Sequence, residues 1–249
     1  MDIHMLYHGS DEVVNNPRFG VGKADNDYGS GFYTTEDPES AKEWAVINGQ
    51  AGKGVSNQYE LDFEGLNVLH LDDYGTLAWI AEVISNRGTD NALNAEIGDL
   101  LVSKFKVDTS KADVIVGYRA DDSYIKVVDA FLEGKLTIDE VDRMFRKGQL
   151  GTQVFIKSPE AFEKIKFIDF ENVKEEQGYG DRDRIARREG STFLKSRERA
   201  IQIDGLDVST KGLTVRDAIK GNLEYKDGYY QHWGSAKNHK RGGTDYDPD

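Results

Sequence analysis

The sequence predicts an α+β fold. Short segments with the two-residue period of strands and longer segments with a helical repeat follow one another in irregular order, without a regular strand–helix–strand unit. The chain has 249 residues, of which 38% are apolar, which suits one sizeable domain or one domain with an appendage. No internal repeat is visible.

The N-terminal segment predicts two short strands joined by a long loop. Residues 3–7 form the first strand and place His8 at its end, and residues 31–35 form a compact strand of aromatic and β-branched residues. The intervening residues 11–30 are rich in Gly, Asn and Asp, which is typical of a polar loop. A helix should then begin at Asp37, an N-cap residue followed by proline.

The middle of the chain alternates helical stripes with short apolar strands. Ser158, followed by proline, predicts the start of one further short helix. The expected strands are 58–71 (in two pieces), 113–117, 153–157 and 166–170, and the expected helical stripes are 77–84, 93–101 and 125–145.

Apolar residues become sparse beyond about residue 170, where we place a soft domain boundary. Residues 171–249 are therefore expected to form a charged C-terminal extension that is partly disordered, most of all over residues 234–249. A short strand is expected at residues 200–203. Seven basic side chains between Arg182 and Arg199 predict a solvated charged helix or a disordered arm.

Charge and composition narrow the classes of partner. The net charge is −13, and residues 1–170 carry 17 Lys and Arg against 30 Asp and Glu, whereas residues 171–249 carry 15 of each. An acidic first part disfavours nucleic acid as a partner and leaves protein as the favoured macromolecule. The sequence has no run of 18 apolar residues, so we expect no membrane span. We also expect no signal peptide, because no basic segment followed by an apolar stretch precedes the first strand. The absence of cysteine fits the cytoplasm, or export without a classical signal peptide.

His8, Gly9 and Ser10 form the first candidate binding group. A glycine allows a ligand to approach the backbone, whose N–H and C=O match the acceptor and donor of a primary carboxamide. The neighbouring histidine could donate a hydrogen bond to a ribose hydroxyl. A packed or surface histidine is the alternative interpretation, and the three residues alone do not decide between the two.

Tyr33 and Trp44 form the second candidate group. Strand alternation places Phe32 and Tyr33 on opposite faces, so that one of them lies in the core and the other faces elsewhere. A tyrosine on a strand and a tryptophan on the following helix could enclose a flat cationic ring by stacking and cation–π attraction. Ordinary core packing remains the alternative for both. The histidines show no metal-ligand spacing, and we expect no metal.

These residues resemble a known superfamily. His8-Gly9-Ser10, then Asp27-Tyr28-Gly29-Ser30-Gly31-Phe32-Tyr33-Thr34-Thr35, then Trp44-Ala45, resemble the ADP-ribosyltransferases of the diphtheria-toxin and poly(ADP-ribose) polymerase branch. Further marks are Asp113–Gly117, Ala120-Asp121-Asp122 and Gln153-Val154, which look like those of a bacterial family within that superfamily. The similarity covers about residues 3–170. It implies a split β-sandwich with a helical insertion at about 76–147.

The resemblance also implies roles for individual residues. His8 would hold a ribose hydroxyl of NAD, Gly9 the nicotinamide amide, and Tyr33 and Trp44 the nicotinamide ring. Ser10 and Thr34 would complete the NAD contacts, with NAD as a co-substrate. The position of the family's catalytic glutamate is occupied by Gln153, which together with His8 and Tyr33 would form the catalytic set.

Transfer of ADP-ribose from NAD to an acceptor is therefore the leading hypothesis. Cleavage of the bond between nicotinamide and ribose develops positive charge on the sugar, and a glutamine offers only a dipole where a glutamate offers a charge. Two alternatives stay open: a module that binds NAD or ADP-ribose without turnover, and a protein-interaction domain with a vestigial site.

Overall fold

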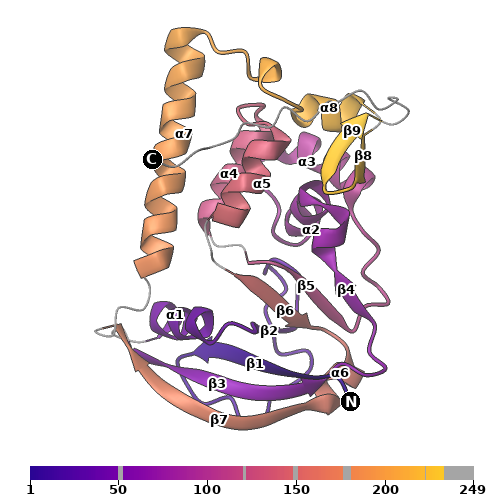
Figure 1. The fold of residues 1–249 in the computed structure, drawn as a ribbon, viewed down its shortest axis with the longest axis vertical. Helices are drawn as coiled ribbons and strands as arrows, with labels where there is room; N and C mark the ends of the chain where they lie inside the picture. Colours follow the sequence, from indigo (N-terminus) through magenta and orange to yellow (C-terminus); the bar gives the residue numbers. More distant parts are fainter. Residues whose placement is uncertain (50–52, 120–121, 148–150, 176–180, 222, 233–249) are drawn as a thin grey trace, which may run out of the picture.

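The structure, a computed structural model, has the α+β architecture that the sequence predicts (Figure 1). Two β-sheets lie one above the other, and a layer of helices covers the second sheet. The structure describes residues 1–49, 53–119, 122–147, 151–175, 181–221 and 223–232.

The first sheet consists of three antiparallel strands in the order β1-β3-β7. Its members are β1 (Ile3–Ser10), β3 (Lys53–Asp62) and β7 (Ile165–Lys174). The short helix α6 (Pro159–Lys164) leads into β7 and begins at Ser158, whose hydroxyl accepts from the backbone N–H of Ala161, as the sequence predicts.

Helix α1 (Pro38–Asn48) packs directly on β1 and β3. It begins as predicted, because the Asp37 carboxylate accepts a hydrogen bond from the backbone N–H of Glu39. Its close approach requires a glycine in β1: a Cβ on Gly9 would lie 2.1 Å from the carbonyl oxygen of Ala41. Gly9 therefore fixes how near the helix, and Trp44 with it, comes to the end of β1.

The second sheet has four strands in the order β2-β6-β5-β4. They are β2 (Phe32–Thr34), β6 (Thr152–Ile156), β5 (Val114–Tyr118) and β4 (Val68–His70), and only the β4–β5 pair is parallel. A bridge between Tyr7 and Thr35 joins the two sheets, with N–H···O distances of 2.8 and 2.9 Å. This bridge places the end of β1, and so His8, beside β2.

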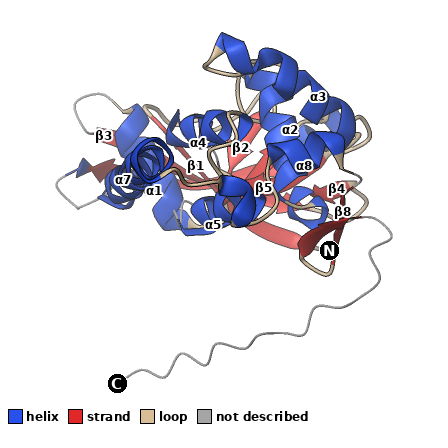
Figure 2. Cartoon of the chain, turned by 90° about the horizontal axis from the view of Figure 1, so that it is seen from above, coloured by secondary structure: helices blue, strands red, loops and turns tan. Residues whose placement is uncertain are grey.

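Apolar side chains from both sheets meet in one cluster between them. The first sheet supplies Leu6, Tyr59 and Leu61, and the second supplies Val114, Val154 and Ile156. The opposite face of the second sheet packs under the helices (Figure 2) through a larger cluster that includes Trp79, Phe131, Phe145 and Phe155. The second sheet is thus buried on both faces, which explains the fully apolar run in β5.

The helical layer is built mainly from the middle of the chain. Its elements are α2 (Thr76–Arg87), α3 (Ala95–Phe105), α4 (Asp122–Leu132) and α5 (Ile138–Lys147), with the short 3₁₀ turns Leu71–Tyr74 and Ala92–Asn94. Each of these helices falls on a helical stripe predicted from the sequence.

The C-terminal part packs against this layer. Helix α8 (Val215–Lys220) buries Val215 and Ala218 in the same cluster as α2. The 3₁₀ turn Val208–Thr210 precedes it, and the hairpin β8 (Leu223–Lys226) and β9 (Tyr229–His232) follows it. The expected boundary at residue 170 falls inside β7, so the sheet continues into the extension. The disorder expected over 234–249 lies outside the described residues.

Helix α7 (Asp181–Asp204) runs along one side of the molecule. The strand predicted at residues 200–203 is wrong, because these residues form the last turn of this helix. Leu194, Arg197 and Ile201 have helical spacing, and Arg197 forms an ion pair with Glu140 of α5.

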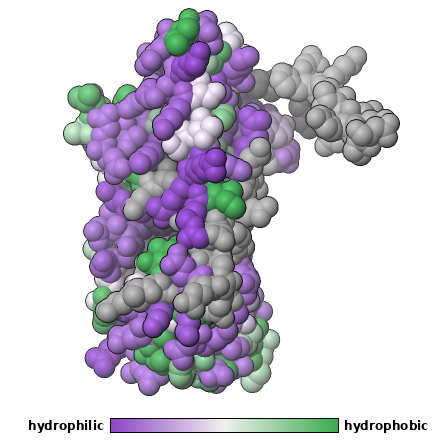
Figure 3. Space-filling view, turned by 90° about the vertical axis from the view of Figure 1, so that its left-hand side faces the viewer, coloured by the Kyte–Doolittle hydropathy of each residue, from purple (hydrophilic) through white to green (hydrophobic). Residues whose placement is uncertain are grey.

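The face that carries α7 is largely hydrophilic, with only scattered apolar side chains (Figure 3). No helix within the described ranges combines the length and the apolar character that crossing a membrane requires.

Candidate functional site

His8 occupies the point where the two sheets meet. Its Nδ1 atom lies 2.7 Å from the carbonyl oxygen of Tyr33, and its ring packs on Phe32 with centroids 4.5 Å apart. A carbonyl only accepts, so Nδ1 carries the proton and Nε2 of a neutral ring is left as an acceptor. Burial lowers the pKa of His8, which favours that neutral ring.

This arrangement revises the role expected for His8. The sequence suggested a hydrogen bond donated to a ribose hydroxyl. With Nδ1 engaged, the neutral ring accepts through Nε2 instead, which has no partner among the described residues. A hydroxyl group on a ligand would then be the donor.

Tyr33 anchors the polar loop between β1 and β2. Its hydroxyl donates to the carbonyl of Gly29 at 2.8 Å and accepts from the backbone N–H of Tyr28 at 3.0 Å. Its ring packs on Phe155 with centroids 4.7 Å apart. Burial raises the pKa of Tyr33, so the phenol stays neutral. Phe32 points the other way, into the contact with His8, as strand alternation predicts.

Three residues of the expected NAD contact set have structural partners. The Thr34 hydroxyl is buried and donates to the carbonyl of Val154 at 2.7 Å. The Ser10 hydroxyl donates to the carbonyl of Glu12 and accepts from the side-chain amide of Asn57. Gly9 packs on α1, as described above. These contacts account for the three residues without a ligand.

Trp44 lies under a cation that the sequence did not single out. The guanidinium of Arg119 stands 4.7 Å from the Trp44 ring centroid, an interaction of about 1–2 kcal/mol at a buried site. Trp44 is 8% exposed, and its indole Nε1 is buried without a hydrogen-bond partner among the described residues. No ring contact joins Tyr33 and Trp44 in the described part of the chain, and each ring has neighbours of its own.

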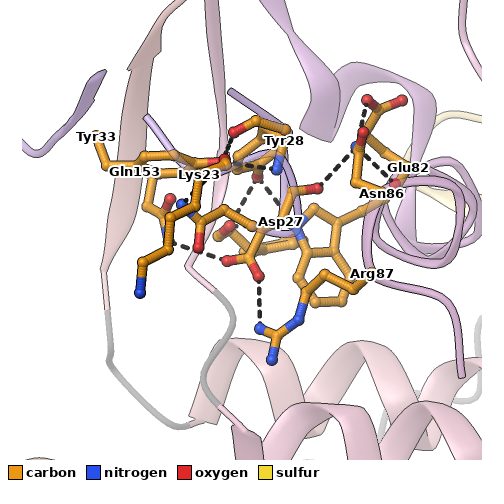
Figure 4. Close-up of polar contacts among 12 residues, drawn as sticks. Lys23, Asp27, Tyr28, Tyr33, Glu82, Asn86, Arg87 and Gln153 are labelled. Atoms are coloured by element: carbon orange, nitrogen blue, oxygen red, sulfur yellow. Dashed lines mark hydrogen bonds and ion pairs between the residues drawn. The ribbon is translucent and has the colours of Figure 1, made fainter. Parts of the chain in front are cut away.

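Gln153 lies in the middle of a buried polar network. It is only 4% exposed, and its Nε2 lies 3.3 Å from Oδ2 of Asp27. The other carboxylate oxygen of Asp27 accepts from Arg87 of α2 at 2.9 Å. Figure 4 shows Gln153 and Arg87 reaching Asp27 from different sides. The carbonyl oxygen of the Gln153 side chain is buried and has no partner within the described residues.

The same network ties the polar loop to α2. The Asn86 side chain donates to the carbonyl of Asp27 at 3.1 Å, and the Tyr28 hydroxyl donates to the carbonyl of Tyr118 at 2.7 Å. The Trp79 indole donates to the Tyr28 hydroxyl at 3.0 Å. Asp27 and Tyr28 are thus held rigidly between the second sheet and the helical layer.

The structure therefore brings part of the predicted set together. His8 bonds to the backbone of Tyr33, but its ring packs on Phe32, on the opposite face of β2 from the Tyr33 side chain. Strand pairing places Tyr33 opposite Phe155, two residues from Gln153 and on the same face of the sheet. Trp44 approaches this group through Gly9, since a Cβ there would lie 2.7 Å from the Trp44 Cβ.

Asp27, Arg87 and Arg119 were not assigned a role from the sequence. Asp27 is the first residue of the segment 27–35, and no sequence pattern indicates its contact with a glutamine 126 positions away. Ala120 and Asp121, two further marks of the resemblance, lie outside the described residues. Within the described ranges, no cluster of three or more His, Asp or Glu side chains has the arrangement of a metal site.

The comparison with protein families identifies the chain's family. The model of the family described as Protein of unknown function (DUF3990) matches residues 4–167, which is more than half of the chain. The chain therefore belongs to this family. The match runs from β1 into β7 and includes every candidate residue discussed above. No curated protein and no solved structure shows a significant match.

Proposed function

We propose that the chain transfers ADP-ribose from NAD to an acceptor macromolecule and releases nicotinamide. The observation that carries this proposal is that the three positions resembling the ADP-ribosyltransferase signature lie on or beside β2: His8 bonds to the backbone of Tyr33 in β2, and Gln153 lies on the paired strand β6. The same proposal includes the finer description of the fold as an ADP-ribosyltransferase-like split β-sandwich. The facing sheets and the helices between β4 and β6 support it.

Two buried polar groups without hydrogen-bond partners among the described residues support the presence of a ligand in this region. The Gln153 side-chain oxygen is an acceptor and the Trp44 indole N–H is a donor, and both are buried without partners among the described residues. Leaving such a group unpaired costs about 1–3 kcal/mol, so such groups are rare in folded proteins. Nicotinamide riboside offers hydroxyl donors and an amide that both donates and accepts.

The proposed reaction needs little acid–base chemistry. The bond between ribose C1′ and the nicotinamide nitrogen breaks, and its electron pair leaves with neutral nicotinamide. A lone pair of the acceptor forms the new bond to C1′, and the acceptor's proton passes to solvent. Positive charge develops on the ribose in between. Groups that accept hydrogen bonds from the ribose hydroxyls, such as His8 Nε2 and the Gln153 oxygen, would stabilise that charge.

A second candidate function keeps the ligand and omits the reaction. A module that binds NAD or ADP-ribose without turnover is favoured by one feature, the neutral amide of Gln153 where the resembling enzymes carry a charge. The third candidate is an interaction domain with a vestigial site.

Incubation with NAD labelled in both halves separates these functions. Release of nicotinamide with label transfer to protein in a lysate would support the transferase, and mass spectrometry of the lysate would identify the acceptor. Saturable binding without release would support the binding module. The absence of both binding and release would leave the interaction domain. The variant His8→Ala tests the site in the same assay. Its matched control is His4→Ala, since His4 lies on the same strand and bonds to the exposed Glu36.

A further inference from the structure

Asp27 determines which end of the Gln153 amide is available to a ligand. A carboxylate only accepts hydrogen bonds, so the group that faces Asp27 Oδ2 at 3.3 Å must be the amide NH₂. Rotating the amide by half a turn would bring its oxygen against the carboxylate. The Gln153 oxygen therefore points away from Asp27, buried and without a partner among the described residues.

Asp27 is itself held in place from other sides. Arg87 forms an ion pair with its second oxygen at 2.9 Å, and the Asn86 side chain binds its backbone carbonyl. Asp27 is 5% exposed, so water does little to screen the interaction between its charge and the amide. Gln153 is fixed on β6, in register with Gly117 of β5. The pair is thus preorganised before any ligand binds.

We propose that Asp27 and Gln153 act together as a charged acceptor, in which Asp27 is the positioning residue and the Gln153 oxygen receives the hydrogen bond of a ribose hydroxyl. This inference rests on the proposed function. The carboxylate at Nε2 increases the electron density on the amide oxygen through the conjugated amide, and hydrogen bonds in series strengthen one another. The negative charge that a glutamate would place at the ribose is supplied one hydrogen bond further away.

The pair also explains why glutamate is unfavourable at position 153 in this chain. Gln153→Glu alone would bring two buried carboxylates within about hydrogen-bond distance, where like charges repel strongly. The exchange of both residues, Asp27→Asn with Gln153→Glu, restores one amide and one carboxylate in contact. It moves the charge to the side of the pair that faces the ligand.

Four proteins test this pair: wild type, Asp27→Asn, Gln153→Glu and the double exchange. NAD affinity, kcat and KM for nicotinamide release, and Tm are measured for each, with Asp25→Asn as a control because Asp25 is an exposed acid of the same loop. We expect Asp27→Asn and Gln153→Glu each to lower kcat at least tenfold, with KM changing less than threefold. The double exchange should restore kcat to the wild-type value or above it.

The results that would overturn the pair are distinct from those that would overturn the function. If the wild type cleaves NAD and kcat of the double exchange stays as low as that of Gln153→Glu, Asp27 has no role beyond structure. Recovery of Tm without recovery of kcat leads to the same conclusion, and this comparison holds even if Asp27→Asn alone does not fold. A wild type that neither binds nor cleaves NAD would overturn the proposed function, and the pair with it.

Discussion

The substitution Gly9→Ala tests how β1 and α1 position the site. The new Cβ would lie 2.1 Å from the Ala41 carbonyl oxygen and 2.4 Å from the Ala45 backbone nitrogen, where ordinary contact begins near 3.4 Å. The helix must therefore move by roughly 1.3 Å. Overpacking of this kind costs about 1–3 kcal/mol of unfolding free energy. A loss of about 2 kcal/mol lowers Tm by about 4–8 °C in a chain of this size.

The same displacement should affect the site. Trp44 moves with α1, whereas His8 stays on β1, so the two groups separate by about the distance that the helix moves. A misplacement of about 1 Å can reduce an enzymatic rate on the order of 10²-fold. Calorimetry measures the change in Tm, and nicotinamide release measures the change in rate.

Gly190→Ala is the matched control for this substitution. Gly190 lies within α7, and a Cβ there meets only the Met144 methyl group, at 3.8 Å. Alanine in a helix interior stabilises by roughly 0.5–1 kcal/mol, so Tm should rise slightly. If Gly9→Ala melts within about 1 °C of the wild type, the packing argument for Gly9 is refuted.

Three further predictions concern the residues around β2. Burial lowers the pKa of His8 in the folded state, so the contribution of neutral His8 to stability is complete above the unfolded-state pKa of about 6.5 and is lost as the pH falls below that value. Tm should therefore drop more between pH 7 and pH 5 in the wild type than in His8→Gln. Equal drops in the two proteins would contradict this prediction. His8→Ala and Tyr33→Ala should each weaken NAD binding about tenfold in calorimetric titrations, while His4→Ala leaves the affinity unchanged. Wild-type affinity in both His8→Ala and Tyr33→Ala would show that these residues do not belong to the site. Thr34→Val should lower the free energy of unfolding, measured in urea, by about 1 kcal/mol, because it removes the hydrogen bond from the Thr34 hydroxyl to the Val154 carbonyl. NAD affinity should not change. A loss of affinity at wild-type stability would show instead that Thr34 contacts the ligand.

Local patterns were sufficient to predict most of the elements. The Asp37-Pro38 start of α1 and the apolar run of β5 carry their structural signals within a few residues. The prediction of a strand at residues 200–203 was wrong because it, too, rested on a pattern of only a few residues. Ile201 and Ile203 alternate over too short a stretch to distinguish a strand from the end of a long helix. The packing of α8 into the main core was equally invisible, because six residues show no helical face.

The candidate site could be predicted only in part. His8 and Tyr33 lie in compact motifs, and the strand that carries Gln153 follows from its apolar alternation. The contacts of Asp27 with Gln153 and of Trp44 with Arg119 join residues that are far apart in sequence. Neither residue periodicity nor spacing indicates such pairs. The contact of Gly31 with Phe155 is also of this kind, since a Cβ on Gly31 would lie 2.4 Å from the Phe155 ring.

The position of the nicotinamide ring is the property on which the proposal most depends. Nuclear Overhauser effects between the nicotinamide protons of bound NAD and aromatic protons of the protein measure it directly. We expect contacts to the rings of Tyr33 and Trp44, which disappear in Tyr33→Ala and Trp44→Ala respectively. Bound NAD whose nicotinamide protons show contacts only to other parts of the chain would contradict the site described above.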